Sequence, residues 1–147
     1  MLNKHGFYDS RWHKSKTFKN KFERKYINSD LVVNDHATGL MWQHVASSDR
    51  KTFDDARNWI ENLNQKGYAG YHDWRLPTLE EGASLIESSK KNFYLYIDPL
   101  FIGIQENMWT GDQYGPFDAW VVYFDEGNIV SIPLFDDAYV RVVRSEN

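Results

Sequence analysis

The ten residues His72–Glu81 constrain the fold more than any other stretch of this 147-residue chain. Pro77 disfavours helical backbone geometry in the residue before it, so the chain is expected to enter Pro77 in an extended conformation. A large ring, a fixed positive charge and an apolar residue lie in that extended segment, at Trp74, Arg75 and Leu76. We predict that Trp74 and Leu76 enter the hydrophobic core and that Arg75 pairs with a carboxylate.

A helix is predicted directly after this segment, over residues 78–88. Thr78 and Glu81 fit the capping box Thr-x-x-Glu, in which each side chain satisfies a backbone amide at the start of a helix. Gly82 costs such a helix about 1 kcal/mol relative to alanine, which indicates close backbone packing at that position. The side chains expected to face the core are Leu79, Ala83 and Ile86, with Leu85 at the edge.

The chain before this motif predicts a hairpin followed by a helix. Residues 31–33 and 39–43 are typical of two strands, and Gly39 can supply the positive φ that the connecting turn needs. Residues 52–64 are typical of a helix that begins at the capping residue Thr52. The apolar stripe expected on this helix consists of Phe53, Ala56, Trp59, Ile60 and Leu63.

The C-terminal half predicts strands. Residues 108–110 indicate a short strand, residues 119–124 and 129–134 a β-hairpin, and residues 140–144 a final strand. Helices early in the chain and antiparallel strands late in it indicate an α+β protein, with two helices packed on a small twisted antiparallel sheet.

Several motifs occur in one order along the chain. They are Thr38-Gly39-Leu40-Met41-Trp42-Gln43, Asp73-Trp74-Arg75-Leu76-Pro77-Thr78-Leu79-Glu80-Glu81, Trp109-Thr110, Ala119-Trp120-x-Val122-x-Phe124-x-x-Gly127 and Val140-Arg141-Val142-Val143-Arg144. Over roughly residues 26–144 this series resembles the bacterial Lcl C-terminal domain family, a domain of unknown function. It is also distantly similar to the formylglycine-generating-enzyme (sulfatase-modifying) domains. The resemblance implies a C-type-lectin-like fold with irregular ligand loops at one end of the sheet. It further implies an exported or surface-associated bacterial domain that binds glycans or proteins, often as an oligomer.

The charge distribution divides the chain into a basic aromatic N-terminal extension, residues 1–28, and a C-type-lectin-like domain, residues 29–147. The extension carries eight Lys and Arg against two Asp and Glu, whereas the rest carries nine against nineteen. An acidic main domain argues against nucleic acid as the chief partner. No apolar run approaches the length of a membrane helix. The N-terminus lacks the apolar core of a signal peptide, which leaves a cytoplasmic location and a trimmed exported chain as the two alternatives.

The residue types argue against an enzyme, a metal and a cofactor. The chain has no cysteine, so the paired thiols of formylglycine-generating chemistry and all thiolate metal sites are excluded. The histidines have none of the spacings of a zinc hydrolase; they are His5, His13, His36, His44 and His72. We therefore expect no catalytic residues, no metal ligands and no cofactor.

The favoured site is the pair of loops 111–118 and 135–139, where rings that can stack on sugars or anchor a protein alternate with hydrogen-bonding groups. The candidate ligand-binding residues are Asp112, Gln113, Tyr114, Phe117, Asp118, Trp120, Phe135, Asp136, Asp137 and Tyr139. Their partner would be a glycan or a protein, and the domain could form a homo-oligomer.

Other interpretations of the same residues stay open. The rings could cap the core, and the loop acids could be solvated or could bind calcium. The domain could be an intracellular oligomerisation or interaction module that uses its basic arm, or a hydrolase that uses loop carboxylates. Arg75, Arg141 and Arg144 are expected to be internal ion-pair partners rather than ligand-binding residues.

Overall fold

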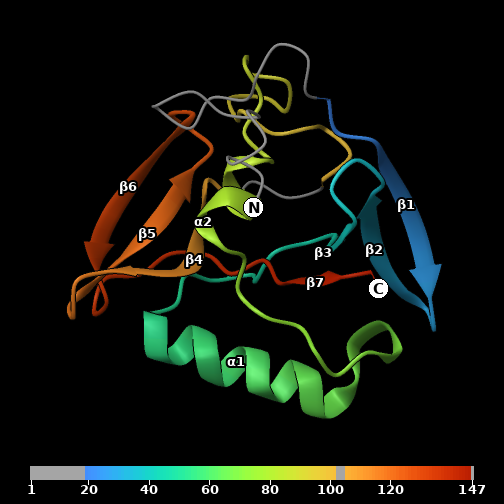
Figure 1. The fold of residues 1–147 in the computed structure, drawn as a ribbon, viewed down its shortest axis with the longest axis horizontal. Helices are drawn as coiled ribbons and strands as arrows, with labels where there is room; N and C mark the ends of the chain where they lie inside the picture. The colour runs from blue at the N-terminus through green and yellow to red at the C-terminus, as the bar shows by residue number, and fades with distance from the viewer. Residues whose placement is uncertain (1–18, 102–104, 147) are drawn as a thin grey trace.

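The computed structural model describes residues 19–101 and 105–146, which form an α+β fold with two antiparallel sheets (Figure 1). The four-stranded sheet has the order β1-β2-β3-β7, and the three-stranded sheet has the order β4-β5-β6. The strands are β1 (Phe22–Ile27), β2 (Asp30–Asp35), β3 (Leu40–Gln43), β4 (Asn107–Tyr114), β5 (Asp118–Tyr123), β6 (Asn128–Pro133) and β7 (Val143–Ser145). The helices are α1 (Phe53–Lys66), the short 3-10 helix η2 (Tyr68–Gly70) and α2 (Leu79–Ala83). The predicted α+β class with two helices is confirmed.

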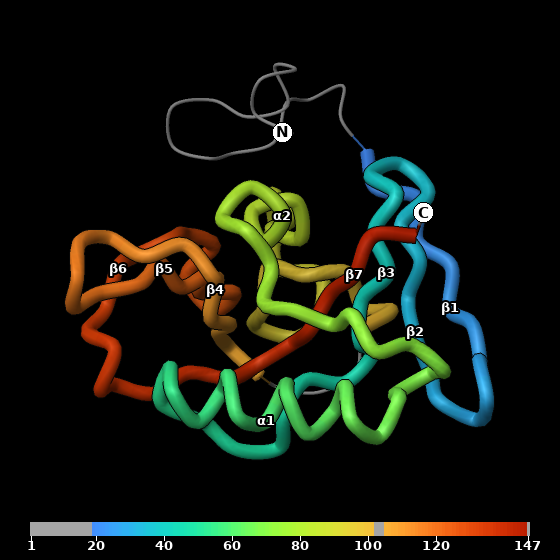
Figure 2. Tube along the Cα trace, turned by 60° about the horizontal axis from the view of Figure 1, so that its bottom comes forward, coloured from blue at the N-terminus to red at the C-terminus, as the bar shows by residue number. Residues whose placement is uncertain are grey.

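Helix α1 forms where the capping and apolar pattern predicts it. The Asp55 amide donates to Thr52 Oγ1 over 3.3 Å at its start, and Gly67 ends it with a φ of 71°. Phe53, Ala56 and Ile60 are buried. They join a core cluster that includes residues of both sheets, and Figure 2 shows α1 running beneath the two sheets.

The predicted first hairpin is confirmed as β2 and β3, with Gly39 at a φ of 71° and Trp42 fully buried. The extension is in part a strand: residues 22–27 form β1, which pairs antiparallel with β2. Asn28 and Ser29 make the connecting two-residue turn, and both have positive φ, as a hairpin turn of this length requires. Residues 1–18 of the extension lie outside the described residues.

The segment that precedes Pro77 holds α1 and β7 together. Trp74 is buried, and both its backbone amide and its carbonyl bond the side chain of Asn64, over 2.8 and 2.9 Å. Arg75 pairs with Val143 through reciprocal backbone hydrogen bonds of 3.0 Å. Leu76 packs half-buried against the same core cluster. The predicted extended segment and the burial of Trp74 are therefore confirmed.

The capping box and the packing at Gly82 are also confirmed. The Glu81 amide donates to Thr78 Oγ1 over 3.1 Å, and the Thr78 amide donates to Glu81 Oε1 over 2.9 Å. A Cβ on Gly82 would lie 2.8 Å from Cγ2 of Val122. Helix α2 therefore packs its backbone directly against β5.

The predicted length of this helix is wrong, because α2 ends at Ala83 rather than near Ser88. The hydroxyl of Ser84 donates over 2.6 Å to the carbonyl three residues before it, and the next two amides make similarly tight turns. The chain then turns away, and the Glu87 amide bonds the Tyr96 carbonyl over 2.9 Å. A side chain that competes for helix carbonyls favours such an early end.

Strand β5 lies in the middle of its sheet and is buried on both faces. Val121 belongs to the core cluster that contains α1, whereas Val122 belongs to a second cluster near α2, and neither is exposed to solvent. The hairpin predicted over residues 119–134 is confirmed as β5 and β6. Strand β5 therefore lies between the two core clusters, with one face toward each.

The predicted last strand is shorter than expected. Only Val143–Ser145 forms β7, and the three residues before it run extended beside Gln43 and Ser47. The predicted ion pairs of two arginines are confirmed. Arg75 bonds Glu81 over 2.6 and 2.9 Å, and Arg144 bonds Asp73 over 2.7 Å.

The prediction that Arg141 forms an ion pair is wrong. Among the described residues it has no carboxylate partner. Its Nη1 donates to the carbonyls of Gln43 and His44, and its guanidinium lies 4.8 Å from the ring centre of Phe101. Burial lowers the pKa of Arg141 to about 9, so the group still carries its charge at neutral pH.

No helix within residues 19–101 and 105–146 is long and apolar enough to cross a membrane.

Candidate recognition surface

The first predicted ligand loop is largely a strand. Residues 111–114 continue β4, and Asp118 begins β5, which leaves residues 115–117 as the turn between them. The register of the two strands shifts between Trp109 and Gln113. A bulge of this kind lets a strand continue through a Gly- and Asp-containing segment that resembles a loop.

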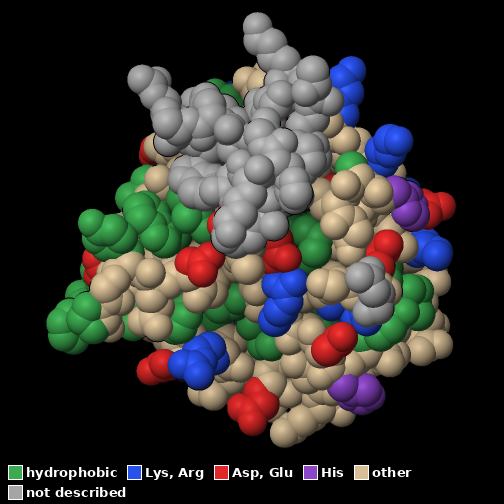
Figure 3. All heavy atoms as spheres, in the orientation of Figure 1, with side chains coloured by type: hydrophobic (Ala, Val, Ile, Leu, Met, Phe, Trp, Pro, Cys, Tyr) green, Lys and Arg blue, Asp and Glu red, His purple; other side chains and the backbone are tan. Residues whose placement is uncertain are grey.

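Four aromatic side chains gather where the three-stranded sheet ends. We call them the aromatic end; they are Tyr114, Phe117, Trp120 and Phe135. Three of them are strongly exposed, with 60% of Tyr114, 77% of Phe117 and 83% of Phe135 open to solvent. In Figure 3, hydrophobic side chains collect at the left of the molecule, over this sheet.

The aromatic end is held by contacts within the sheet. The rings of Tyr114 and Trp120 meet edge to face, with centroids 5.2 Å apart. Trp120 is half-buried, and its carbonyl accepts a 2.8 Å hydrogen bond from Thr110 Oγ1. The Leu134 amide donates to the Phe117 carbonyl over 2.8 Å, which brings the segment of Phe135 beside the β4–β5 turn. The sheet therefore brings the two predicted segments next to each other, with Tyr114 and Trp120 in direct ring contact.

The predicted acidic residues differ in their surroundings. Asp112 Oδ2 accepts the Leu79 amide over 2.6 Å, so this carboxylate holds the first turn of α2. Asp118 is half-buried opposite Tyr114, whereas Asp136 and Asp137 are exposed after β6.

Two predicted residues lie apart from the aromatic end. Tyr139 is half-buried and lies beside the first residue of β4, because its amide donates to Asn107 Oδ1 over 3.0 Å. Its ring lies 5.6 Å from the Arg50 guanidinium. Gln113 is exposed beside α1 and lines a groove there.

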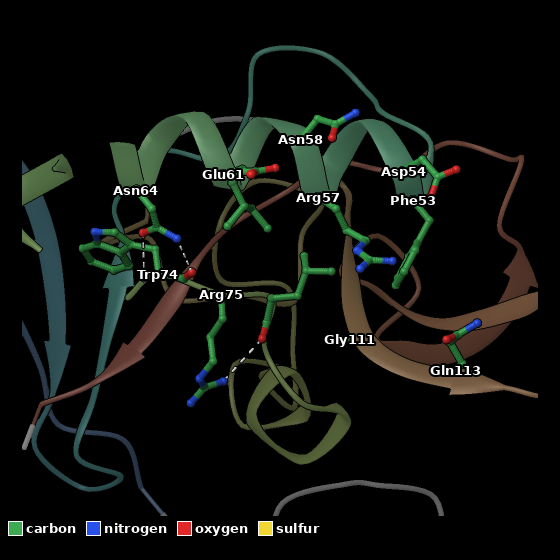
Figure 4. A pocket seen from close by; sticks show the side chains of 12 residues that line it. Phe53, Asp54, Arg57, Asn58, Glu61, Asn64, Trp74, Arg75, Gly111 and Gln113 are labelled. Atoms are coloured by element: carbon green, nitrogen blue, oxygen red, sulfur yellow. Dashed lines mark hydrogen bonds between the residues drawn. The ribbon is translucent and has the colours of Figure 1, made fainter. Parts of the chain in front are cut away.

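This groove lies between α1, β4 and the Trp74–Leu76 segment, and its volume is about 860 Å³. Figure 4 shows Arg57 pointing from α1 into the groove toward Gly111, with Gln113 on the far side. Its lining residues are Phe53, Asp54, Arg57, Asn58, Ile60, Glu61, Asn64, Trp74, Arg75, Leu76, Gly111 and Gln113. The groove and the Tyr114–Trp120 pair are built on opposite faces of the β4–β5 hairpin, because neighbouring strand residues point to opposite faces.

Sequence reasoning missed this groove. The charged and polar residues that α1 contributes to the groove lie away from its apolar stripe. Their sequence pattern is the same as that of an ordinary solvated helix face. The only signal was the exposed polar side of the helix, which does not reveal that β4 lies beside it.

Charged groups near the site are mostly structural. Burial alone would raise the pKa of Glu81, but hydrogen bonds from Arg75 and the Thr78 amide outweigh burial and leave the pKa below its usual value. Burial raises the pKa of the Tyr123 hydroxyl, and the nearby Asp136 carboxylate raises it further. Within the part of the chain that the structure describes, no three or more His, Cys, Asp or Glu side chains are grouped to hold a metal ion.

The chain matches the model of a known protein family. The model of the Lcl C-terminal domain family matches residues 31–144, which is more than half of the chain. The chain belongs to this family. No curated protein matches it. The matched region of this Lcl C-terminal domain begins within β2 and runs into β7, so it includes the Trp74 segment, both helices, the groove and the aromatic end.

Proposed function

We propose that this Lcl C-terminal domain is a non-catalytic recognition module that binds a glycan or a protein ligand at its aromatic end. The observation that carries the proposal is the exposure of Tyr114, Phe117 and Phe135 on adjoining segments at one end of a sheet, where Tyr114 also contacts the half-buried Trp120. Large rings that project from a sheet give a ligand apolar area at a low cost in side-chain entropy. The edge-to-face contact with Trp120 holds Tyr114 in place before a ligand arrives.

The exposed acids next to the rings support recognition rather than catalysis. Asp136 and Asp137 lie on the surface after β6, where they can accept hydrogen bonds from sugar hydroxyls or peptide amides. A glycosidase needs two carboxyl groups facing each other across a cleft, whereas the two acids that line the groove, Asp54 and Glu61, both come from α1. Asp112, however, is engaged by the amide of Leu79, and it does not line the groove.

We also infer that the arrangement is C-type-lectin-like. The inference is supported by two helices packed against small antiparallel sheets and by a last strand that returns beside β3. In such an architecture the ligand surface lies at one end of a sheet, as the aromatic end does.

The test is a binding screen of the intact protein against glycans, polyanions and candidate proteins, with and without calcium. A variant with both Tyr114→Ala and Phe117→Ala should weaken any true ligand at least about tenfold, because each ring in a recognition hot spot contributes on the order of 1–2 kcal/mol. Unfolding measurements should show little change, since both rings are exposed.

The matched control carries Tyr26→Ala and Phe93→Ala. These residues are the same types with similar exposure, 76% and 86%, and neither belongs to the three-stranded sheet. Ligands that bind the control and the wild type equally, but not the aromatic-end variant, support the proposal. Ligands that bind all three proteins equally place the site elsewhere.

A further inference from the structure

The outer side of β6 has no strand partner among residues 19–101 and 105–146. In this region β6 pairs with β5 alone, and Figure 1 shows it as the outermost strand of its sheet. A free strand edge presents backbone amides and carbonyls to which another chain can add. The segment Asn128–Pro133 carries no charged residue, and its Val130 is 41% exposed.

Strand β1 is also an edge strand with one side unpaired by the described part of the chain, and it contrasts with β6. It carries Glu23, Arg24 and Lys25 in an exposed row, and charges of this kind protect a free edge from pairing. In an antiparallel pair of two β1 strands centred midway between Arg24 and Lys25, each Arg24 would lie opposite Lys25 of the second copy, which is a repulsive arrangement. Strand β6 carries no such charges, and its edge is blunted only at its end, by Pro133.

The hydrogen-bond pattern determines which groups of β6 face outward. The Leu134 amide donates to the Phe117 carbonyl across the β5–β6 ladder. Alternate residues of an antiparallel strand face alternate sides, so the amides of Ile129 and Ser131 point to the outer edge. Pro133, the next outward position, has no amide hydrogen to leave unpaired.

We propose that β6 pairs antiparallel with β6 of a second copy of this chain, around a twofold axis at Val130. In this register Ile129 of each copy faces Ser131 of the other, so every outward amide meets an outward carbonyl. Val130 faces Val130 of the second copy at the close, non-hydrogen-bonded position, where side chains pack most tightly. The two three-stranded sheets then become one continuous sheet.

A second copy is the occupant that this edge fits best. The outward groups of β6 are spaced so that the strand complements itself, which is the requirement for a twofold interface. Each copy carries a net charge of −4, and the paired segment Asn128–Pro133 contains no charged side chain, since the neighbouring acids Asp125, Glu126, Asp136 and Asp137 lie beyond its two ends. This proposal does not depend on the ligand proposed for the aromatic end.

The test measures the mass of the intact protein by sedimentation over a concentration series that ends at about 1 mM, the weak limit of specific association. The wild type should form a dimer. Val130→Lys should weaken the dimer at least about tenfold, because two ammonium groups would face each other across the axis. The control is Val45→Lys, since Val45 is a similarly exposed valine, 43% against 41%, outside the strands; it should leave the dimer intact.

Hydrogen exchange gives a second, residue-specific result. Protection of the Ile129 and Ser131 amides should rise with protein concentration in the wild type and not in the Val130→Lys variant. A wild type that stays monomeric throughout the series overturns the proposal, and so does a dimer that Val130→Lys leaves unchanged. Protection of both amides that does not vary with concentration would show that another part of the same chain covers the edge, which also overturns it.

Discussion

Replacing Glu81 with glutamine tests how the central motif is stabilised. Glu81 is mostly buried, accepts two hydrogen bonds from the Arg75 guanidinium and accepts the Thr78 amide. Glutamine keeps the shape and one acceptor oxygen but removes the charge. A hydrogen bond to a charged group contributes about 1.5–3 kcal/mol, and the partial exposure of Arg75 reduces that value through solvent screening. We expect Glu81→Gln to lower the free energy of unfolding by about 2 kcal/mol at neutral pH.

The pH dependence identifies the cause of this loss. The pKa of Glu81 is lower in the folded protein than its ordinary value. The carboxylate therefore contributes stability above the pKa of the unfolded chain, and that contribution is lost as the pH falls through the folded pKa. Urea unfolding of the wild type and the variant should show a difference at neutral pH that shrinks below about pH 4.

The control for this experiment is Glu61→Gln, at an exposed position on α1, which should change the free energy of unfolding by less than about 0.5 kcal/mol. A difference between wild type and Glu81→Gln that is the same at neutral and acidic pH would refute the role assigned to the charge.

Two further substitutions test the packing. Gly82→Ala should destabilise the protein by about 1–2 kcal/mol in urea unfolding despite the better helix propensity of alanine, because the new Cβ would lie 2.8 Å from Val122 Cγ2. Adding Val122→Ala should make the Gly82 substitution less costly, and a stabilised single variant would contradict the packing described here. Arg141→Lys should lower the free energy of unfolding by about 2–4 kcal/mol. A lysine ammonium lacks the planar guanidinium that bonds two carbonyls and lies over the Phe101 ring. Thermal unfolding measures this loss, and an unchanged midpoint would show that the guanidinium is dispensable.

Part of the candidate surface could be predicted from the sequence. Tyr114, Phe117 and Phe135 were expected to be available to a ligand, and all three are exposed, on segments that lie next to each other. The position of Tyr114 in strand β4 was not predictable, because Gly and Asp in residues 111–118 indicate a loop. Only the paired strand β5 and the bulge keep residues 111–114 in the sheet. The groove beside α1 was also beyond prediction, since a cavity depends on which elements become neighbours.

The sequence alone determined the features that depend on a few neighbouring residues. The capping box at Thr78, the cap at Thr52 and the turn at Gly39 are local because side chains and backbone amides within one turn satisfy each other. The tertiary structure decided where those elements end and what surrounds them. It determined the early end of α2, and it surrounded Arg141 with carbonyls and a ring instead of an acid. Those outcomes depend on partners far away in the chain, and the arrangement of distant partners is established only when the two sheets pack together.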